Sequence, residues 1–153
     1  MTYKFEQLEV WQLAMEYVDA IYVLAEKLPR SEEYNLKSQI VRAATSVALN
    51  IAEGSTGQTN AEQARFLGMA IRSLIETVAC QHLIRRRHYV SDESLITTVY
   101  SKSQILARKL QSFRKSLAPA LGQIREEPAS YISETDEFWF LSSIVYCPSS
   151  KTL

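Results

Sequence analysis

The stretch that decides the fold runs from Phe5 to Gly54 and reads FEQLEVWQLAMEYVDAIYVLAEKLPRSEEYNLKSQIVRAATSVALNIAEG. Its first half, up to about Leu28, repeats apolar residues at three- and four-residue steps, which is the period of an amphipathic helix. Pro29 ends this segment because proline cannot continue a helix and restricts the residue before it. The first half therefore predicts one long helix.

The second half of the stretch predicts another helix. Ser31, followed by Glu32 and Glu33, offers a capping hydroxyl and then acids in a first turn. Gly54 ends the pattern, and glycine accepts the positive φ that commonly closes a helix. The predicted core positions of this helix are Leu36, Ile40, Ala43, Val47 and Ile51.

Two further segments repeat the helical pattern. Asn60 with Gln63 resembles a capping box and begins the third, which runs to about Arg87. Ser91-Asp92-Glu93 caps the fourth, which a proline closes near residue 119. Short connections between long helices favour antiparallel neighbours. Residues 1–121 are therefore predicted to form an all-α, antiparallel up-down four-helix bundle.

Residues 122–153 have a different composition. They carry Pro128, Pro148, an acidic run and the aromatic cluster Phe138-Trp139-Phe140. A wholly disordered segment usually lacks such a cluster. Two interpretations stay open: an extension that docks on the bundle or on another chain, and a disordered extension with no role.

The bulk composition excludes several classes of protein. The chain has 153 residues, enough for one domain with a core that needs no disulfide or metal. Cys80 and Cys147 lie far apart and form no CxxC pattern, so neither a disulfide framework nor a zinc site is expected. We find no signal peptide and no apolar run of the roughly 18 residues that a membrane helix needs. The expected location is the cytoplasm, with no cofactor and no metal.

The net charge of zero hides an uneven distribution. Residues 1–64 hold five Lys/Arg and nine Asp/Glu, residues 65–121 hold ten and three, and residues 122–153 hold two and five. The third and fourth predicted helices are therefore basic. Two explanations stay open: an anion-binding face, and charge complementarity within the bundle or between subunits.

The second predicted helix carries an ordered polar strip beside its apolar stripe. Most of its remaining circumference is Ala, Val or Ile, which favours burial on more than one side and hence a subunit interface. Arg72 and Glu76, one turn apart on the third helix, join this seam as a helix-stabilising pair or as an interface ion pair. The polar strip is interpreted either as a structural seam, inside the bundle or at that interface, or as a partner site. It consists of Gln39, Arg42, Ser46, Asn50 and Glu53.

Two groups of cations are the candidate binding residues for nucleic acid or another partner. The first is the run Arg85-Arg86-Arg87 at the end of the third helix, where cations also suit the helix dipole. The second is Arg108 and Lys115, which lie opposite the core stripe of the fourth helix. Such residues contact phosphates in a salt-dependent way, although a solvated helix face has the same pattern.

Enzymatic interpretations have little support. The di-iron sites of four-helix bundles need Glu three residues before His, but Ala79 and Arg85 stand before His82 and His88. The chain contains no GxxxxGK[ST], GxGxxG or GxSxG motif. Glu53 and Glu76 would make a carboxylate pair only if their helices face each other. The chain is therefore predicted not to be an enzyme.

The chain resembles the four-helix bundle proteins encoded within 23S ribosomal RNA intervening sequences, the S23 family. The resemblance rests on Leu8, Val10 and Trp11, on Leu28-Pro29 with Glu33 and Leu36, on Gln39, Arg42-Ala43-Ala44 and Ser46, on Asn50-Ile51-Ala52-Glu53-Gly54, and on Arg65-Phe66-Leu67, Ala70, Ser73-Leu74 and Glu76. It covers about 115 residues. Arg72 departs from it, since the family usually has a small residue there.

This resemblance implies a left-turning up-down bundle that forms a ring-like homopentamer. It also implies kinship with the accessory variability proteins of diversity-generating retroelements, which bind a reverse transcriptase and nucleic acid through a basic surface. We therefore expect a non-enzymatic, homo-oligomeric module for RNA, DNA or a nucleic-acid-handling protein such as a reverse transcriptase. The alternative is a purely structural or protein-binding scaffold.

Overall fold

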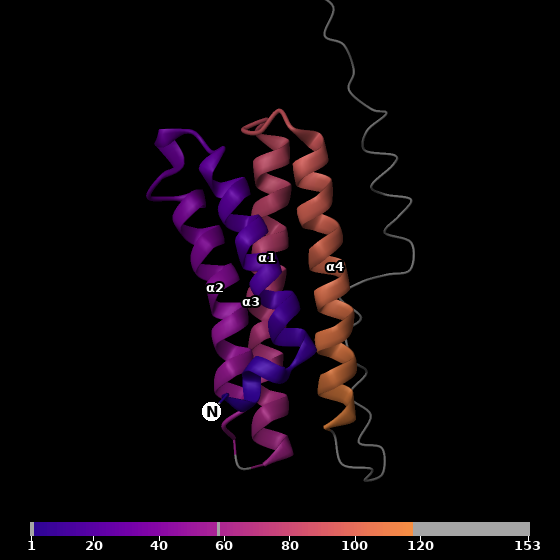
Figure 1. The fold of residues 1–153 in the computed structure, drawn as a ribbon. Helices are drawn as coiled ribbons and strands as arrows, with labels where there is room; N and C mark the ends of the chain where they lie inside the picture. The colour runs from indigo at the N-terminus through magenta and orange to yellow at the C-terminus, as the bar shows by residue number, and fades with distance from the viewer. Residues whose placement is uncertain (1, 58, 118–153) are drawn as a thin grey trace, which may run out of the picture. The chain divides into compact units, whose positions relative to one another are not determined.

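The computed structural model describes residues 2–57 and 59–117, and within them it is all-α (Figure 1). The described residues contain no strand, so the predicted fold class is confirmed. Residues 122–153, including Cys147, lie outside the described residues, and both interpretations of that segment stay predictions. The elements are η1 Lys4–Gln7, α1 Glu9–Glu26, η2 Arg30–Glu32, α2 Leu36–Gly54, α3 Asn60–Arg86 and α4 Glu93–Ser116, where η marks a 3₁₀ helix.

The four α-helices run alternately up and down and pack side by side (Figure 1). Helix α1 contacts α2 and α4, and α3 contacts the same two helices. Consequently α1 and α3 face each other across the diagonal of the bundle. The up-down four-helix bundle predicted from the short connections is therefore confirmed. None of the described helices is long and apolar enough to span a membrane.

The core lies along the axis between the helices. Each fully buried Leu or Ile contributes on the order of 1.5–3 kcal/mol to folding through the hydrophobic effect. The predicted core positions of α2 are all buried, and so are Ala44 and Ala48, whose small side chains let neighbouring helices approach closely. The largest fully buried side chains are Tyr17, Ile21, Leu24, Ile40, Ile51, Leu67, Leu74, Ile84, Leu106 and Leu110.

Helix α2 begins later than the sequence pattern predicts. Ser31 lies inside η2 and is exposed, so its predicted capping role is wrong. The carboxylate of Glu32 organises this turn instead, because it accepts hydrogen bonds from Asn35 Nδ2 at 2.9 Å and from the Leu36 amide at 3.4 Å. It also accepts a bond from the Tyr89 hydroxyl at 2.9 Å, which ties the α1–α2 connection to the α3–α4 connection.

The start of α3 lies one residue before the predicted cap, because the Thr59 hydroxyl, not Asn60, accepts the Glu62 amide at 3.1 Å. At the start of α4, Asp92 is the capping residue within the predicted Ser91-Asp92-Glu93, and its carboxylate accepts the Leu95 amide at 3.1 Å. A capping side chain and an acid in the first turn are expected at a helix start, because the first amides of a helix have no hydrogen-bond partner within it.

The positive φ expected at Gly54 occurs at His88 instead, with φ of 54°. The His88 amide donates to the Arg85 carbonyl at 3.0 Å and the Tyr89 amide donates to the Ile84 carbonyl at 3.2 Å, the pattern that closes a helix with one left-handed residue. Gly54 is the buried last residue of α2 and needs glycine for another reason. A Cβ there would lie 2.7 Å from the Cβ of Phe66 on α3.

A chain of buried polar side chains crosses the bundle from α1 to α3. Gln81 Nε2 donates to the Tyr17 hydroxyl at 2.8 Å, and that hydroxyl lies 2.6 Å from Thr77 Oγ1. Since Thr77 Oγ1 donates to the Leu74 carbonyl at 2.6 Å, Tyr17 is the donor to Thr77. Burial raises the pKa of Tyr17 well above its usual value. The Gln81 Oε1 atom has no partner among the described residues.

Candidate functional site

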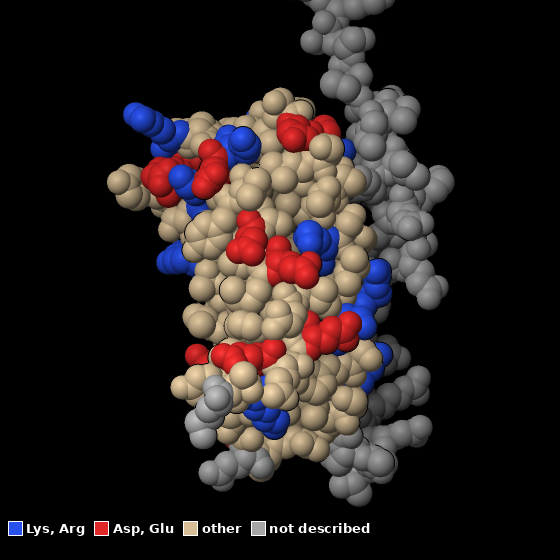
Figure 2. All heavy atoms as spheres, viewed as in Figure 1, with Lys and Arg blue, Asp and Glu red and all other residues tan. Residues whose placement is uncertain are grey.

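Two of the basic residues of α4 bind α1. Lys109 Nζ lies 2.8 Å from Glu9 Oε1, and Lys102 Nζ lies 3.1 Å from Glu16 Oε2. The two pairs are one heptad apart on both helices, as the antiparallel packing requires. Figure 2 shows acidic side chains on the face formed by α1 and basic ones toward the edge formed by α4. For Lys102 and Lys109, charge complementarity within the bundle is therefore the explanation.

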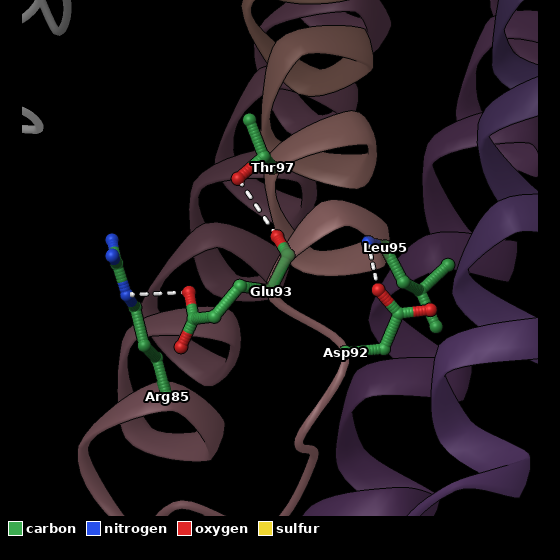
Figure 3. A network of polar contacts seen from close by, with 5 residues as sticks. All are labelled: Arg85, Asp92, Glu93, Leu95 and Thr97. Carbon is green, nitrogen blue, oxygen red and sulfur yellow. Dashed lines mark hydrogen bonds and ion pairs between the residues drawn. The ribbon is translucent and has the colours of Figure 1, made fainter.

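The run Arg85-Arg86-Arg87 does not form one group of free cations. The Arg85 side chain is only 22% exposed, and its Nε lies 3.3 Å from Glu93 Oε2 at the start of α4 (Figure 3). Arg86 and Arg87 are exposed at the end of α3. Successive helical residues project about 100° apart, so neighbours in sequence point in different directions. Arg85 thus belongs to the α3–α4 junction, and Arg86 and Arg87 stay candidates for binding.

The junction at Arg85 also contains the first turn of α4 (Figure 3). Thr97 Oγ1 donates to the Glu93 carbonyl at 2.8 Å, while the Glu93 carboxylate reaches back to Arg85. Hydrogen bonds from Ser94 and from the Leu95 amide lower the pKa of Asp92, so its carboxylate stays ionised at the positive end of the helix dipole. Arg85, Asp92 and Glu93 therefore each have a local structural role at this end of the bundle.

The other predicted cations of α4 have no such task. Arg108 and Lys115 are exposed, and no described carboxylate forms an ion pair with them. Arg114 is exposed too, and its guanidinium lies over α3, where a Cβ on Gly68 would be 3.7 Å from Arg114 Cζ. This part of the bundle therefore presents unneutralised positive charge to solvent.

The polar strip of α2 lies on the outer surface of the chain rather than inside the bundle. Gln39 Nε2 donates to Glu76 Oε1 at 3.3 Å across the α2–α3 groove, and both side chains are exposed. Arg42, Glu53 and Arg72 are exposed as well. The interpretation as a network within the bundle is wrong, and a subunit interface or a partner site stays a prediction for this strip.

The smaller members of the strip satisfy their own helix. Asn50 Nδ2 donates to the Ser46 carbonyl at 2.7 Å, and both residues are partly exposed. Leu49 on the same helix is 55% exposed, so apolar surface accompanies the polar strip. A helix with exposed apolar and self-satisfied polar groups side by side is suited to contact with another protein surface.

The carboxylates of Glu53 and Glu76, which could act together only if they faced each other, do not form a pair. Glu76 lies opposite Gln39, whereas Glu53 is fourteen residues further along α2, about 21 Å away at 1.5 Å per residue. Glu53 instead borders a shallow depression with Glu62 and Phe66. No group of three or more His, Cys, Asp or Glu side chains in the described part of the chain is placed to hold a metal ion.

The comparisons with known proteins agree with this architecture. A family model described as the 23S rRNA-intervening sequence protein matches residues 6–112. A crystal structure at 1.70 Å of a protein of unknown function from the S23 ribosomal protein family of Bacteroides thetaiotaomicron VPI-5482 is similar, with a TM-score of 0.64 and 25% sequence identity. The similarity covers 69% of this chain and 98% of that chain. The comparison with curated proteins found no match.

Proposed function

Because the chain belongs to the 23S rRNA-intervening sequence protein family, we propose that it is a non-enzymatic, homo-oligomeric binding and assembly module. Its proposed partner is RNA or a nucleic-acid-handling protein such as a reverse transcriptase. This proposal includes the link to accessory proteins of diversity-generating retroelements that the sequence resemblance implies. The separation of Glu53 from Glu76 supports the non-enzymatic part, because it removes the one candidate acid–base pair.

The observation that carries the proposal is the surplus of exposed cations on α3 and α4. Lys102, Lys109 and Arg85 are taken up by ion pairs within the bundle. Exposed arginine is well suited to phosphate, because its planar guanidinium donates hydrogen bonds in a fork. The cations of these helices and their caps that remain without a described ion-pair partner are Arg65, Arg72, Arg86, Arg87, Arg108, Arg114 and Lys115.

The assembly part of the proposal rests on the outer α2–α3 surface. The strip Gln39, Arg42 and Glu76, together with the exposed Leu49, is proposed to lie between subunits, while Arg72, predicted as part of this seam, is assigned to the exposed basic surface instead. Interfaces of this kind combine an apolar contact with paired charges. The family resemblance favours a ring of five copies, each of 17.4 kDa.

A purely protein-binding or structural scaffold is the second candidate. Met15 and Tyr22 lie one heptad apart on α1 and are 37% and 48% exposed, so they form an apolar strip on one face. Exposed apolar strips bind proteins rather than phosphates. In this case the basic surface would meet an acidic protein.

Light scattering on a sizing column tests the proposal, with the full chain run alone and with a structured RNA at two salt concentrations. An oligomer that shifts with RNA at low salt, and shifts less at high salt, is the expected result. An oligomer that ignores RNA at both salt concentrations would favour the scaffold. A monomer under all conditions would contradict the assembly part of the proposal.

A further inference from the structure

Cross-helix contacts fix how α3 and α4 lie against each other. Residue numbers on α3 fall as those on α4 rise, which is the antiparallel register. The His82 and Tyr100 rings have centroids 5.8 Å apart. The contacts join Arg85 to Glu93, His82 to Tyr100 and Gly68 to Arg114. Interpolation between them places any residue of α3 level with its counterpart on α4 to within about one helical turn.

This register brings the unneutralised cations together in two levels. Arg72 on α3 lies level with Arg108 on α4, and Arg65 lies level with Lys115. The spacing is seven residues on both helices, so each pair shares one face and the two levels are about 10.5 Å apart along the axis. Arg114 lies between the helices over Gly68. We call Arg65, Arg72, Arg108, Arg114 and Lys115 the basic ladder.

The faces of the two helices agree with this arrangement. Arg65 and Arg72 lie within about 60° of Gly68 around α3, on the outer side of the surface that Arg114 covers. Arg108 lies about 160° around α4 from the buried Leu106 and Leu110 and about 100° from Lys109, which faces α1, so it projects outward from the bundle on the side away from α1. Arg108 and Lys115 on α4 and Arg65 and Arg72 on α3 thus project from the outer surface of these two neighbouring helices.

Two acids of α3 lie one turn from members of the basic ladder, Glu76 from Arg72 and Glu62 from Arg65. The Glu76 carboxylate accepts a hydrogen bond from Gln39 on α2, and Glu62 borders the depression beside α2. Asp92 caps α4 at its opposite end, and Glu93 binds Arg85 there. Five cations against these two nearby acids leave a net positive potential over two helical turns of each helix.

The surroundings of the basic ladder indicate what kind of anion it fits. Single-stranded nucleic acids are bound largely by aromatic side chains that stack on bases. Phe66 lies in the depression beside α2, Tyr100 packs on His82, and Phe113 is one heptad from the buried Leu106. No exposed aromatic ring of the described α3 and α4 residues is therefore placed beside these cations.

A protein partner is also a poorer fit for this surface. Protein interfaces centre on well-packed apolar or aromatic residues. The large exposed apolar residues of α3 and α4 are Leu83, which lies near Arg85, and Ile105, which lies one turn from Arg108. A single apolar side chain beside the ladder does not form a packed apolar centre. A surface of arginines and small residues such as Gly68 instead suits backbone phosphates, which give position but no base sequence.

We propose that the basic ladder is a binding site for the phosphate backbone of a double-stranded nucleic acid, and that it does not read base sequence. This inference rests on the proposed function and identifies the ligand class and the surface. The two cations on each helix, one heptad apart, contact phosphates of the duplex backbone.

Fluorescence anisotropy of labelled nucleic acids with the full chain tests this site. The probes are a short RNA duplex and an oligouridine with the same number of phosphates, with polyglutamate as a competitor. The site variant combines Arg72→Gln with Arg108→Gln. Its matched control combines Lys27→Gln with Arg30→Gln, which removes the same charge from exposed positions at the α1–α2 connection of the same bundle.

The site variant is expected to bind the duplex on the order of 10- to 100-fold more weakly near 0.1 M salt. Its plot of log affinity against log salt should be shallower by about 1.8, since each lost phosphate contact removes about 0.9 from the slope. The control variant should stay within about threefold of the unmodified chain. Replacement of Arg72 and Arg108 by Lys should retain most of the affinity because the charges remain, and circular dichroism verifies that each variant is folded.

Several outcomes would overturn the inference, and one would overturn the proposed function as well. If the control variant loses more affinity than the site variant, nucleic acid is bound elsewhere. If oligouridine binds as tightly as the duplex, the ligand class is wrong. If polyglutamate displaces the duplex at equal charge concentration, an acidic protein is the better partner. If the unmodified chain binds no nucleic acid at low salt, the proposed function itself fails.

Discussion

The diagonal hydrogen-bond chain gives a sharp prediction about stability. Tyr17→Phe removes the hydroxyl that joins Gln81 Nε2 to Thr77 Oγ1. The Gln81 amide, whose oxygen already has no described partner, would then be buried with both of its polar atoms unpaired. A buried polar group without a hydrogen-bond partner lowers the free energy of unfolding by about 1–3 kcal/mol. Part of this loss is offset because Phe, unlike Tyr, has no hydroxyl to remove from water on folding. We expect the free energy of unfolding to fall by about 2 kcal/mol.

A substitution of Gln81 separates the effect of losing the hydrogen bond from the effect of leaving the buried amide unpaired. Gln81→Met removes the amide and its unpaired oxygen together, while Tyr17 keeps Thr77 as its acceptor. We expect this change to alter stability by less than about 1 kcal/mol. The double variant should be more stable than the sum of the single effects predicts, with a coupling of about 1–2 kcal/mol.

Urea unfolding followed by circular dichroism at one fixed protein concentration measures these values, because an oligomer's stability depends on concentration. Tyr22→Phe is the matched control, since Tyr22 is on the same helix and 48% exposed, and it should change stability by less than about 0.5 kcal/mol. The reasoning is refuted if Tyr17→Phe behaves like Tyr22→Phe, or if the effects of the two core changes are additive.

Three other predictions concern single residues. Gly54→Ala should lower stability by about 1–3 kcal/mol in urea unfolding, because the added Cβ would lie 2.7 Å from the Phe66 Cβ; a neutral result would mean that α3 shifts freely. His88→Gly should raise the melting temperature and stabilise by about 1 kcal/mol, because His88 has a φ of 54°; a loss of stability would mean that the His88 side chain has a compensating contact. Burial raises the pKa of Tyr17 above its usual 10.0, so its contribution to stability is complete below pH 10 and is lost as the pH rises further. Alkaline unfolding should therefore be less steep in Tyr17→Phe, and an unchanged profile would contradict that assignment.

The existence of each helix could be predicted from the sequence, but the position of its cap could not. Three- and four-residue periodicity and Pro29 locate the helices to within a few residues. Thr59 stands beside Asn60 and Asp92 beside Ser91, and both members of each pair have a side chain able to cap. Which one caps depends on how the connection packs, and that information is tertiary.

The buried polar side chains of α3 could have been recognised in the sequence, because they occupy positions of the apolar stripe. Thr77 and Gln81 continue the stripe of Leu67, Ala70 and Leu74 at three- and four-residue steps. Polar residues on a buried stripe must find partners. The diagonal partner, Tyr17, comes from a helix sixty residues away in the chain and cannot be identified from a local pattern.

The arginine run shows why the candidate site could be predicted only in part. Contiguity makes Arg85-Arg86-Arg87 the most conspicuous basic feature of the sequence, yet a helix separates contiguous residues around its circumference. Residues seven apart share a face, so Arg65 with Arg72 and Arg108 with Lys115 form a surface without being adjacent. The register between α3 and α4 is needed to join these two pairs.

The ion pairs between α1 and α4 have a consequence for the order in which the bundle assembles. Glu9–Lys109 and Glu16–Lys102 join the first helix to the last, so this boundary closes across most of the described chain. The other three helix contacts each close over a single short connection. Loop-closure entropy therefore makes the α1–α4 boundary the last to form and the first to open. In native-state hydrogen exchange, amides along this boundary should lose protection before those between α2 and α3. The bundle is thus expected to open first where its first and last helices meet.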